Sequence, residues 1–138
     1  MSDPNGYNPM RWDCITKGCF NVKRRPKIEI FSDCFPGRIG MGDVDGLVEI
    51  NGRFLLLEWK TESTNLPTGQ RILYERLTQK DGFAVIVVVG DAETMEVSQL
   101  CWFVQGRQTP WLNATMETVK QRIKGWAGYS LEAKRATT

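Results

Sequence analysis

The sequence contains no histidine. This absence excludes a Ser-His-Asp triad, proton transfer by an imidazole and every zinc site that uses a histidine ligand. The sequence also lacks any apolar run near the roughly 20 residues that a membrane-spanning helix needs. Its first segment, MSDPNGYNPMRWD, has no apolar signal-peptide core. We therefore expect a cytoplasmic protein with no membrane partner.

Cysteine is scarce, with four residues in the chain. In a cytoplasmic protein we expect reduced structural thiols rather than disulfides. The alternative is a zinc site with ligands Cys14, Cys19 and Cys34, completed by Cys101 or a nearby acidic residue. The C-x4-C spacing of the first pair is loose for zinc, and no second close pair follows. Reduced thiols are therefore the default interpretation.

The length of 138 residues and the hydrophobic fraction of 41% are typical of one globular domain. We expect a single domain over residues 1–138. Gly, Pro and Asn in about residues 1–13 indicate a flexible arm. We expect a frayed tail over about residues 131–138.

Charge is unevenly distributed along the chain. Lys and Arg outnumber Asp and Glu in residues 1–40 and 101–138, whereas acidic residues are in excess in residues 41–100. This distribution suits a protein that binds phosphates with its ends and presents carboxylates to a metal ion from its middle. The side chains that we expect to contact nucleic-acid phosphates are Lys23, Arg24, Arg25, Lys27, Lys120 and Lys124.

The predicted elements alternate between strands and helices. We expect β-structure over residues 27–31, two strands within residues 45–60, and further strands over residues 83–89 and 100–104. The continuous β-branched run FAVIVVV is typical of a strand that is buried on both faces. This order predicts a mixed α/β fold with a central sheet.

Two helices are predicted between and after these strands. The first begins near Pro67 and runs to about Lys80, with Gly82 as its C-terminal stop. The second starts from Asn113, and its apolar residues at helical spacing are Met116, Val119, Ile123 and Trp126.

The dipeptide Asn51-Gly52 lies between two apolar segments and predicts a hairpin with a two-residue type I′ turn. Such a turn sets Ile50 opposite Arg53 and fixes the register of the whole hairpin. Both faces of the hairpin are mostly apolar, so we expect both to be covered.

The same register sets Asp45 opposite Glu58, with Cβ atoms roughly 5 Å apart. Lys60 follows two residues later and lies on the same face. Facing carboxylates destabilise a sheet unless a cation lies between them. Mg²⁺ or Mn²⁺ with two carboxylate ligands and open positions could polarise a phosphoryl group and activate water, while Lys60 stabilises the developing charge or orients the water. The alternative is a set of solvated charges at the end of a hairpin.

Asp45, followed by Glu58-Trp59-Lys60, resembles the core motif of the PD-(D/E)XK nuclease superfamily. The following helix, with its PTGQR start, and the apolar strand after it are similar to VRR-NUC and Holliday-junction-resolvase-like members. The resemblance covers about residues 41–90. Gln70 matches a helix Gln that faces the site in those members, and its spacing to Tyr74 matches the Gln-x-x-x-Tyr pattern of RecB-like members.

The resemblance implies a restriction-endonuclease-like α/β core, with a central mixed β-sheet flanked by helices. It implies Asp45 and Glu58 as metal ligands, and the implied catalytic residues are Asp45, Glu58, Lys60 and Gln70. Val44 replaces the family's Pro, and the nearest candidate for an upstream acidic residue is Glu29. We therefore expect one ion rather than two, with Asp43 as a weaker additional candidate.

The resulting hypothesis is a metal-dependent nuclease that hydrolyses phosphodiester bonds in DNA. Resemblance to stand-alone members suggests branched or flapped substrates, a homodimer and a phage origin. One alternative is a non-catalytic nucleic-acid-binding module on a nuclease fold. A third hypothesis, based on the cysteines alone, is a zinc-stabilised interaction protein.

Overall fold

The computed structural model describes residues 26–62 and 66–133. The chain divides into two units, residues 1–43 and residues 44–138. In the described part of the first unit, Ile28–Cys34 form a 3-10 helix, η1. The prediction of β-structure over residues 27–31 is therefore wrong. The apolar alternation there fits a strand, but the backbone bonds locally, with the N–H of Ile30 donating to the carbonyl of Lys27 at 3.1 Å.

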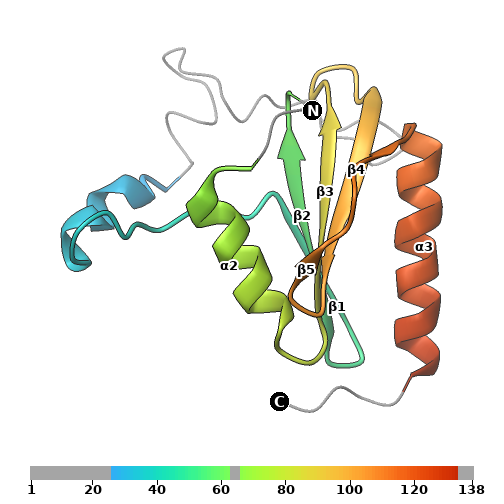
Figure 1. The fold of residues 1–138 in the computed structure, drawn as a ribbon, viewed down its shortest axis with the longest axis horizontal. Helices are drawn as coiled ribbons and strands as arrows, with labels where there is room; N and C mark the ends of the chain where they lie inside the picture. The colour runs from blue at the N-terminus through green and yellow to red at the C-terminus, as the bar shows by residue number, and fades with distance from the viewer. Residues whose placement is uncertain (1–25, 63–65, 134–138) are drawn as a thin grey trace. The chain divides into compact units, whose positions relative to one another are not determined.

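The second unit is a mixed α/β fold built on one six-stranded sheet (Figure 1). Its elements are β1 (Gly46–Ile50), β2 (Arg53–Lys60), α2 (Thr68–Thr78), β3 (Phe83–Gly90), β4 (Val97–Val104), β5 (Arg107–Gln108), β6 (Leu112–Asn113) and α3 (Met116–Glu132). The strand order is β1-β2-β3-β4-β5, and β6 also pairs with β4. Only β2 and β3 are parallel, because α2 connects them as a crossover. The predicted mixed sheet with flanking helices is confirmed at this level.

The β1–β2 hairpin has the predicted register. Asn51 and Gly52 have φ angles of 55° and 80°, as a type I′ turn requires, and Ile50 pairs with Arg53. The Asn51 amide also donates to the carbonyl of Ala133 at 2.8 Å, so the turn satisfies an acceptor at the end of α3. This turn therefore fixes the hairpin and ties it to the helix.

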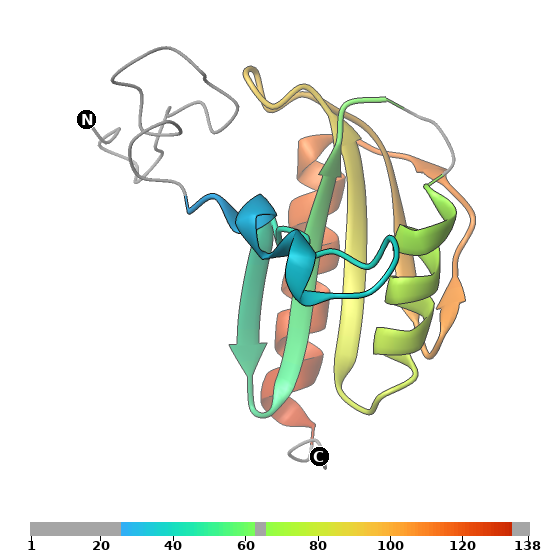
Figure 2. The same cartoon turned by 90° about the vertical axis from the view of Figure 1, so that its left-hand side faces the viewer.

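The two helices of the second unit cover opposite faces of the sheet (Figures 1 and 2). On the α3 face, Leu55, Ile86, Val88 and Leu100 form the main cluster with the predicted stripe of α3. On the α2 face the buried residues are Leu66, Tyr74, Val85, Val87, Cys101 and Phe103. The side chains from Val85 to Val88 are fully buried, which confirms the prediction of a strand covered on both faces.

Three details differ from the predictions. Leu47 and Val48 of β1 are exposed, so the expectation that both hairpin faces are covered holds only for β2. Helix α2 ends at Thr78, two residues early. Helix α3 begins at Met116 because Asn113 pairs in β6 and a capping box formed by Thr115 starts the helix.

Within the part of the chain that the structure describes, no helix has the length and apolar character that crossing a membrane requires.

Candidate functional site

Glu58 is held by two hydrogen bonds from α2. The Gln70 amide donates to Oε1 of Glu58 at 2.7 Å, and the Tyr74 hydroxyl donates to Oε2 at 2.8 Å. Gln70 and Tyr74 are one helical turn apart, and the Gln70 amide also lies 3.3 Å from the Tyr74 hydroxyl. The crossover between β2 and β3 lays α2 over the face that carries Glu58. Each carboxylate oxygen therefore has a fixed donor, which sets the orientation of the group.

Asp45 lies directly before β1, where the paired register ends at Gly46 and Leu57. Continuation of that register sets Asp45 opposite Glu58, as predicted. Its Oδ2 accepts the backbone N–H of Trp59 at 2.7 Å, so the side chain takes the place of a main-chain acceptor at the end of the ladder. No described residue donates to Oδ1. The bond through Oδ2 therefore fixes the position of the Asp45 carboxylate.

The pKa of Glu58 is raised above its ordinary value, mainly by burial. The Tyr74 hydrogen bond lowers this pKa, the negative charge of Asp45 raises it, and the Gln70 hydrogen bond and the Lys60 charge lower it. The pKa of Tyr74 is also raised, through burial and its contact with Glu58, so the phenol stays protonated and donates. The site therefore holds negative charge at an energetic cost that a bound cation would relieve.

Lys60 lies on the same strand face as Glu58, two residues further along β2. A pocket of about 330 Å³ opens at this end of the strand, and its lining residues are Glu58, Trp59, Lys60, Thr61 and Glu62. Lys60 is close enough to lower the pKa of Glu58. A phosphate at the pocket would therefore meet the Lys60 cation beside the carboxylates of Glu58 and Glu62.

The donor set at this site consists of two carboxylates. Among residues 26–62 and 66–133 there is no group of three or more acidic or cysteine ligands that could hold a metal ion. Mg²⁺ is commonly bound by one or two carboxylates, with water and substrate phosphate as the other ligands. Asp45 and Glu58 fit such an ion. The further candidates Glu29 and Asp43 belong to the first unit.

Tyr74 was absent from the predicted catalytic set, although its spacing from Gln70 placed both on one helix face. The spacing was the available signal. It could not reveal that both side chains bond to Glu58, because that depends on how α2 lies over the sheet.

Of the predicted phosphate-binding residues, only Lys120 and Lys124 are described residues of the second unit, and neither joins this cluster. Lys23, Arg24 and Arg25 lie outside the described residues, and Lys27 belongs to the first unit. Lys120 and Lys124 are exposed on α3, which covers the other face of the sheet. Their proposed contacts with phosphates stay predictions.

The four cysteines also fall in different parts of the chain. Cys14 and Cys19 lie outside the described residues, and Cys34 is an exposed free thiol in the first unit. Cys101 is fully buried, and burial raises its pKa to about 11, while a hydrogen bond from Gln108 at 3.6 Å lowers it. Cys101 is therefore a protonated residue of the core on the α2 face of the sheet.

Comparison of the chain with known protein families, curated proteins and solved structures gave no match. The function must therefore be inferred from the residues of the site.

Proposed function

We propose that this protein is a metal-dependent nuclease that hydrolyses phosphodiester bonds in DNA. In this proposal its sheet is a restriction-endonuclease-like core of the PD-(D/E)XK type. The main support is the carboxylate of Glu58, which is oriented by Gln70 and Tyr74 and lies beside Asp45 and Lys60. Orienting contacts of this kind are typical of carboxylates that bind metal ions.

Asp45 and Glu58 are the residues that would hold Mg²⁺ or Mn²⁺. A bound ion at such a site supplies Lewis-acid polarisation of a phosphoryl oxygen and acidifies a coordinated water. Lys60 contributes a fixed positive charge close to Glu58, where charge builds on the phosphoryl oxygens in the transition state. Gln70 and Tyr74 keep the Glu58 carboxylate in one orientation, so it need not reorganise during the reaction.

The test is a cleavage assay on end-labelled duplex, flap, four-way-junction and single-stranded DNA, with Mg²⁺, Mn²⁺ or EDTA. We expect cleavage that requires the metal and that is fastest on branched or flapped DNA. Binding without cleavage of any substrate would contradict the proposal and support a non-catalytic nucleic-acid-binding module. Loss of folding in EDTA would instead support a zinc-stabilised interaction protein.

A further inference from the structure

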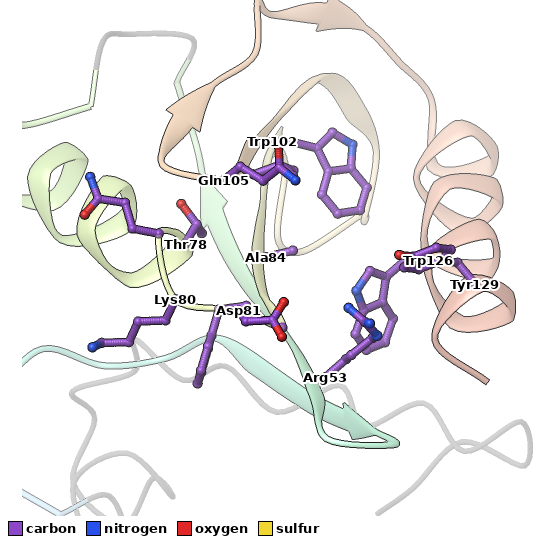
Figure 3. Close-up of a pocket in the computed structure, with 13 residues that line it drawn as sticks. Arg53, Thr78, Lys80, Asp81, Ala84, Trp102, Gln105, Trp126 and Tyr129 are labelled. Carbon is purple, nitrogen blue, oxygen red and sulfur yellow. The ribbon is translucent and has the colours of Figure 1, made fainter. Parts of the chain in front are cut away.

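A second and larger pocket lies at the opposite end of the same parallel strand pair. It has a volume of about 580 Å³ and forms where β2 and β3 begin, between the loop after α2, the end of β4 and the last turns of α3 (Figure 3). Arg53 marks this end of β2, five residues before Glu58. A strand rises about 3.3 Å per residue, so the two positions are about 17 Å apart. The pocket also opens among α3-face residues, whereas Glu58 lies on the α2 face. It is therefore separate from the candidate catalytic site.

Aromatic rings and cations line this pocket. The indoles of Trp102 and Trp126 come from β4 and α3, and both are partly exposed (Figure 3). The Arg53 guanidinium lies 5.2 Å from the centroid of the Tyr129 ring, in a cation–π contact that orients it. Lys80 and Asp81 also belong to the lining, and the Lys80 amine points away from the two indoles (Figure 3). The lining therefore combines flat apolar surfaces with the guanidinium of Arg53.

We propose that this pocket binds a nucleoside phosphate, either as a free mononucleotide or as a nucleotide of single-stranded nucleic acid. Indole rings stack on nucleobases of any identity, because every base has a π-face. Arginine is well suited to phosphate, since its planar donors match the phosphate oxygens. The volume lies within the usual range for small-ligand sites. Arg53 disfavours the other ligand that aromatic walls can hold, an organic cation, because it would repel it.

Amide and indole NMR in EDTA tests this proposal without any contribution from cleavage. Five tryptophans give five indole N–H signals, which Trp→Phe variants assign. We expect adenosine 5′-monophosphate and a short single-stranded oligonucleotide to shift the Trp102 and Trp126 signals, and to leave Trp111 unchanged. A shift with the mononucleotide alone would identify a free nucleotide as the ligand, and a shift with the oligonucleotide alone would identify a nucleic-acid strand.

Two further ligands separate the base from the phosphate. Adenosine should bind more weakly than its monophosphate, and inorganic phosphate alone should not reproduce the indole shifts. Equal affinity for adenosine and the monophosphate would overturn the assignment of a phosphate site. Unchanged Trp102 and Trp126 signals at millimolar concentrations of both nucleotide ligands would overturn the proposal as a whole.

Variants locate the binding site. Trp126→Leu should weaken nucleotide binding by roughly tenfold or more, because it removes a stacking surface. Trp126 contributes to the core, so Tyr129→Ala provides a second test: this ring is 63% exposed, and the change removes the cation–π contact that orients Arg53 with less threat to folding. We expect a several-fold loss of affinity with the fold preserved. Trp111→Leu, outside the pocket, is the control and should keep the wild-type affinity. Equal affinities in all three variants would contradict the proposal.

The outcome is independent of the proposed nuclease activity. If nucleotides do not bind this pocket, the protein can still cleave DNA at Asp45 and Glu58. If the protein does not cleave DNA, nucleotides can still shift the indole signals.

Discussion

The two ends of strand β2 differ in the charge that they concentrate. At the carboxyl end, Asp45 and Glu58 lie beside Lys60, and short hydrogen bonds fix the carboxylates. At the other end, aromatic rings surround Arg53 and the cations outnumber the carboxylates. The first arrangement suits a divalent cation and the second a flat anion. One rigid strand can therefore hold a reactive group and a binding surface at a set separation.

The largest effect should come from removing carboxylate charge at the catalytic end. Asp45→Asn and Glu58→Gln keep the shape of each side chain but weaken metal binding. We expect single-turnover cleavage to fall by about a thousandfold or more, since the metal would carry most of the charge stabilisation. DNA affinity should persist or rise, because a carboxylate no longer repels phosphate. Glu117→Gln, an exposed change on α3, is the control, and wild-type cleavage by Glu58→Gln would refute the nuclease assignment.

Lys60→Met should have the next largest effect. It removes the cation but keeps most of the apolar length of the side chain. We expect cleavage to fall by roughly a hundredfold, which is typical for loss of one charge-stabilising group. Metal binding should be retained, and Lys60→Arg should recover part of the activity. Loss of metal binding in Lys60→Met would show that the lysine acts through structure rather than through the transition state.

Removal of either hydrogen-bond donor on α2 should lower cleavage by less, and loss of the Tyr74 donor should matter more than loss of the Gln70 donor. Tyr74→Phe should lower cleavage by roughly tenfold, and Gln70→Ala by less, because the Tyr74 bond lowers the Glu58 pKa more than the Gln70 bond does. Both changes raise that pKa further, so the acid limb of the pH–rate profile should move to higher pH. Leu73→Ala, on the exposed side of the same helix, is the control. An unmoved acid limb in Tyr74→Phe would contradict this role.

The smallest effect concerns stability without metal. The folded-state pKa of Glu58 is raised above its ordinary value of 4.5, so the folded state holds the proton more tightly than the unfolded state does. Stability from this group is therefore greatest below about pH 4.5 and is lost as the pH rises through the raised pKa. Glu58→Gln should raise the melting temperature slightly at pH 8 and leave it unchanged at pH 4. The effect is small because Glu58 is partly exposed.

Mg²⁺ should reduce the difference in melting temperature between Glu58→Gln and the wild type at pH 8, because it stabilises the wild type. A larger increase in the melting temperature of Glu58→Gln at acidic pH than at pH 8 would contradict the predicted pH dependence.

Local sequence signals predicted much of this fold. Asn51-Gly52 gave the turn and therefore the facing positions of Asp45 and Glu58, because a two-residue turn leaves one register. The apolar run Phe83–Val89 gave the central strand, since such a run needs cover on both faces. Over residues 27–31 an alternating apolar pattern led to a wrong prediction of β-structure, because alternation alone does not supply a neighbouring strand.

Contacts that depend on packing could not be predicted in this way. The Tyr74 bond to Glu58 requires the position of α2 over β2, and the Asp45 bond to the Trp59 backbone depends on where β1 begins. The aromatic pocket joins Arg53, Trp102 and Trp126 from three separate elements, which no local pattern connects. Sequence thus predicted the facing positions of the two carboxylates and a helix Gln at the site, but not the hydrogen bonds by which Gln70 and Tyr74 orient Glu58.

The most direct test of the proposed metal site is a titration of Mn²⁺ into four proteins, followed by electron paramagnetic resonance of the free ion. The proteins are the wild type, Asp45→Asn, Glu58→Gln and Lys60→Met. We predict that the wild type and Lys60→Met bind one ion and that both carboxylate variants bind far more weakly. In the wild type, affinity should fall as the pH drops through the raised pKa of Glu58, because the ion must displace a proton. Equal binding by all four proteins, or no binding by the wild type, would contradict a metal site at Asp45 and Glu58.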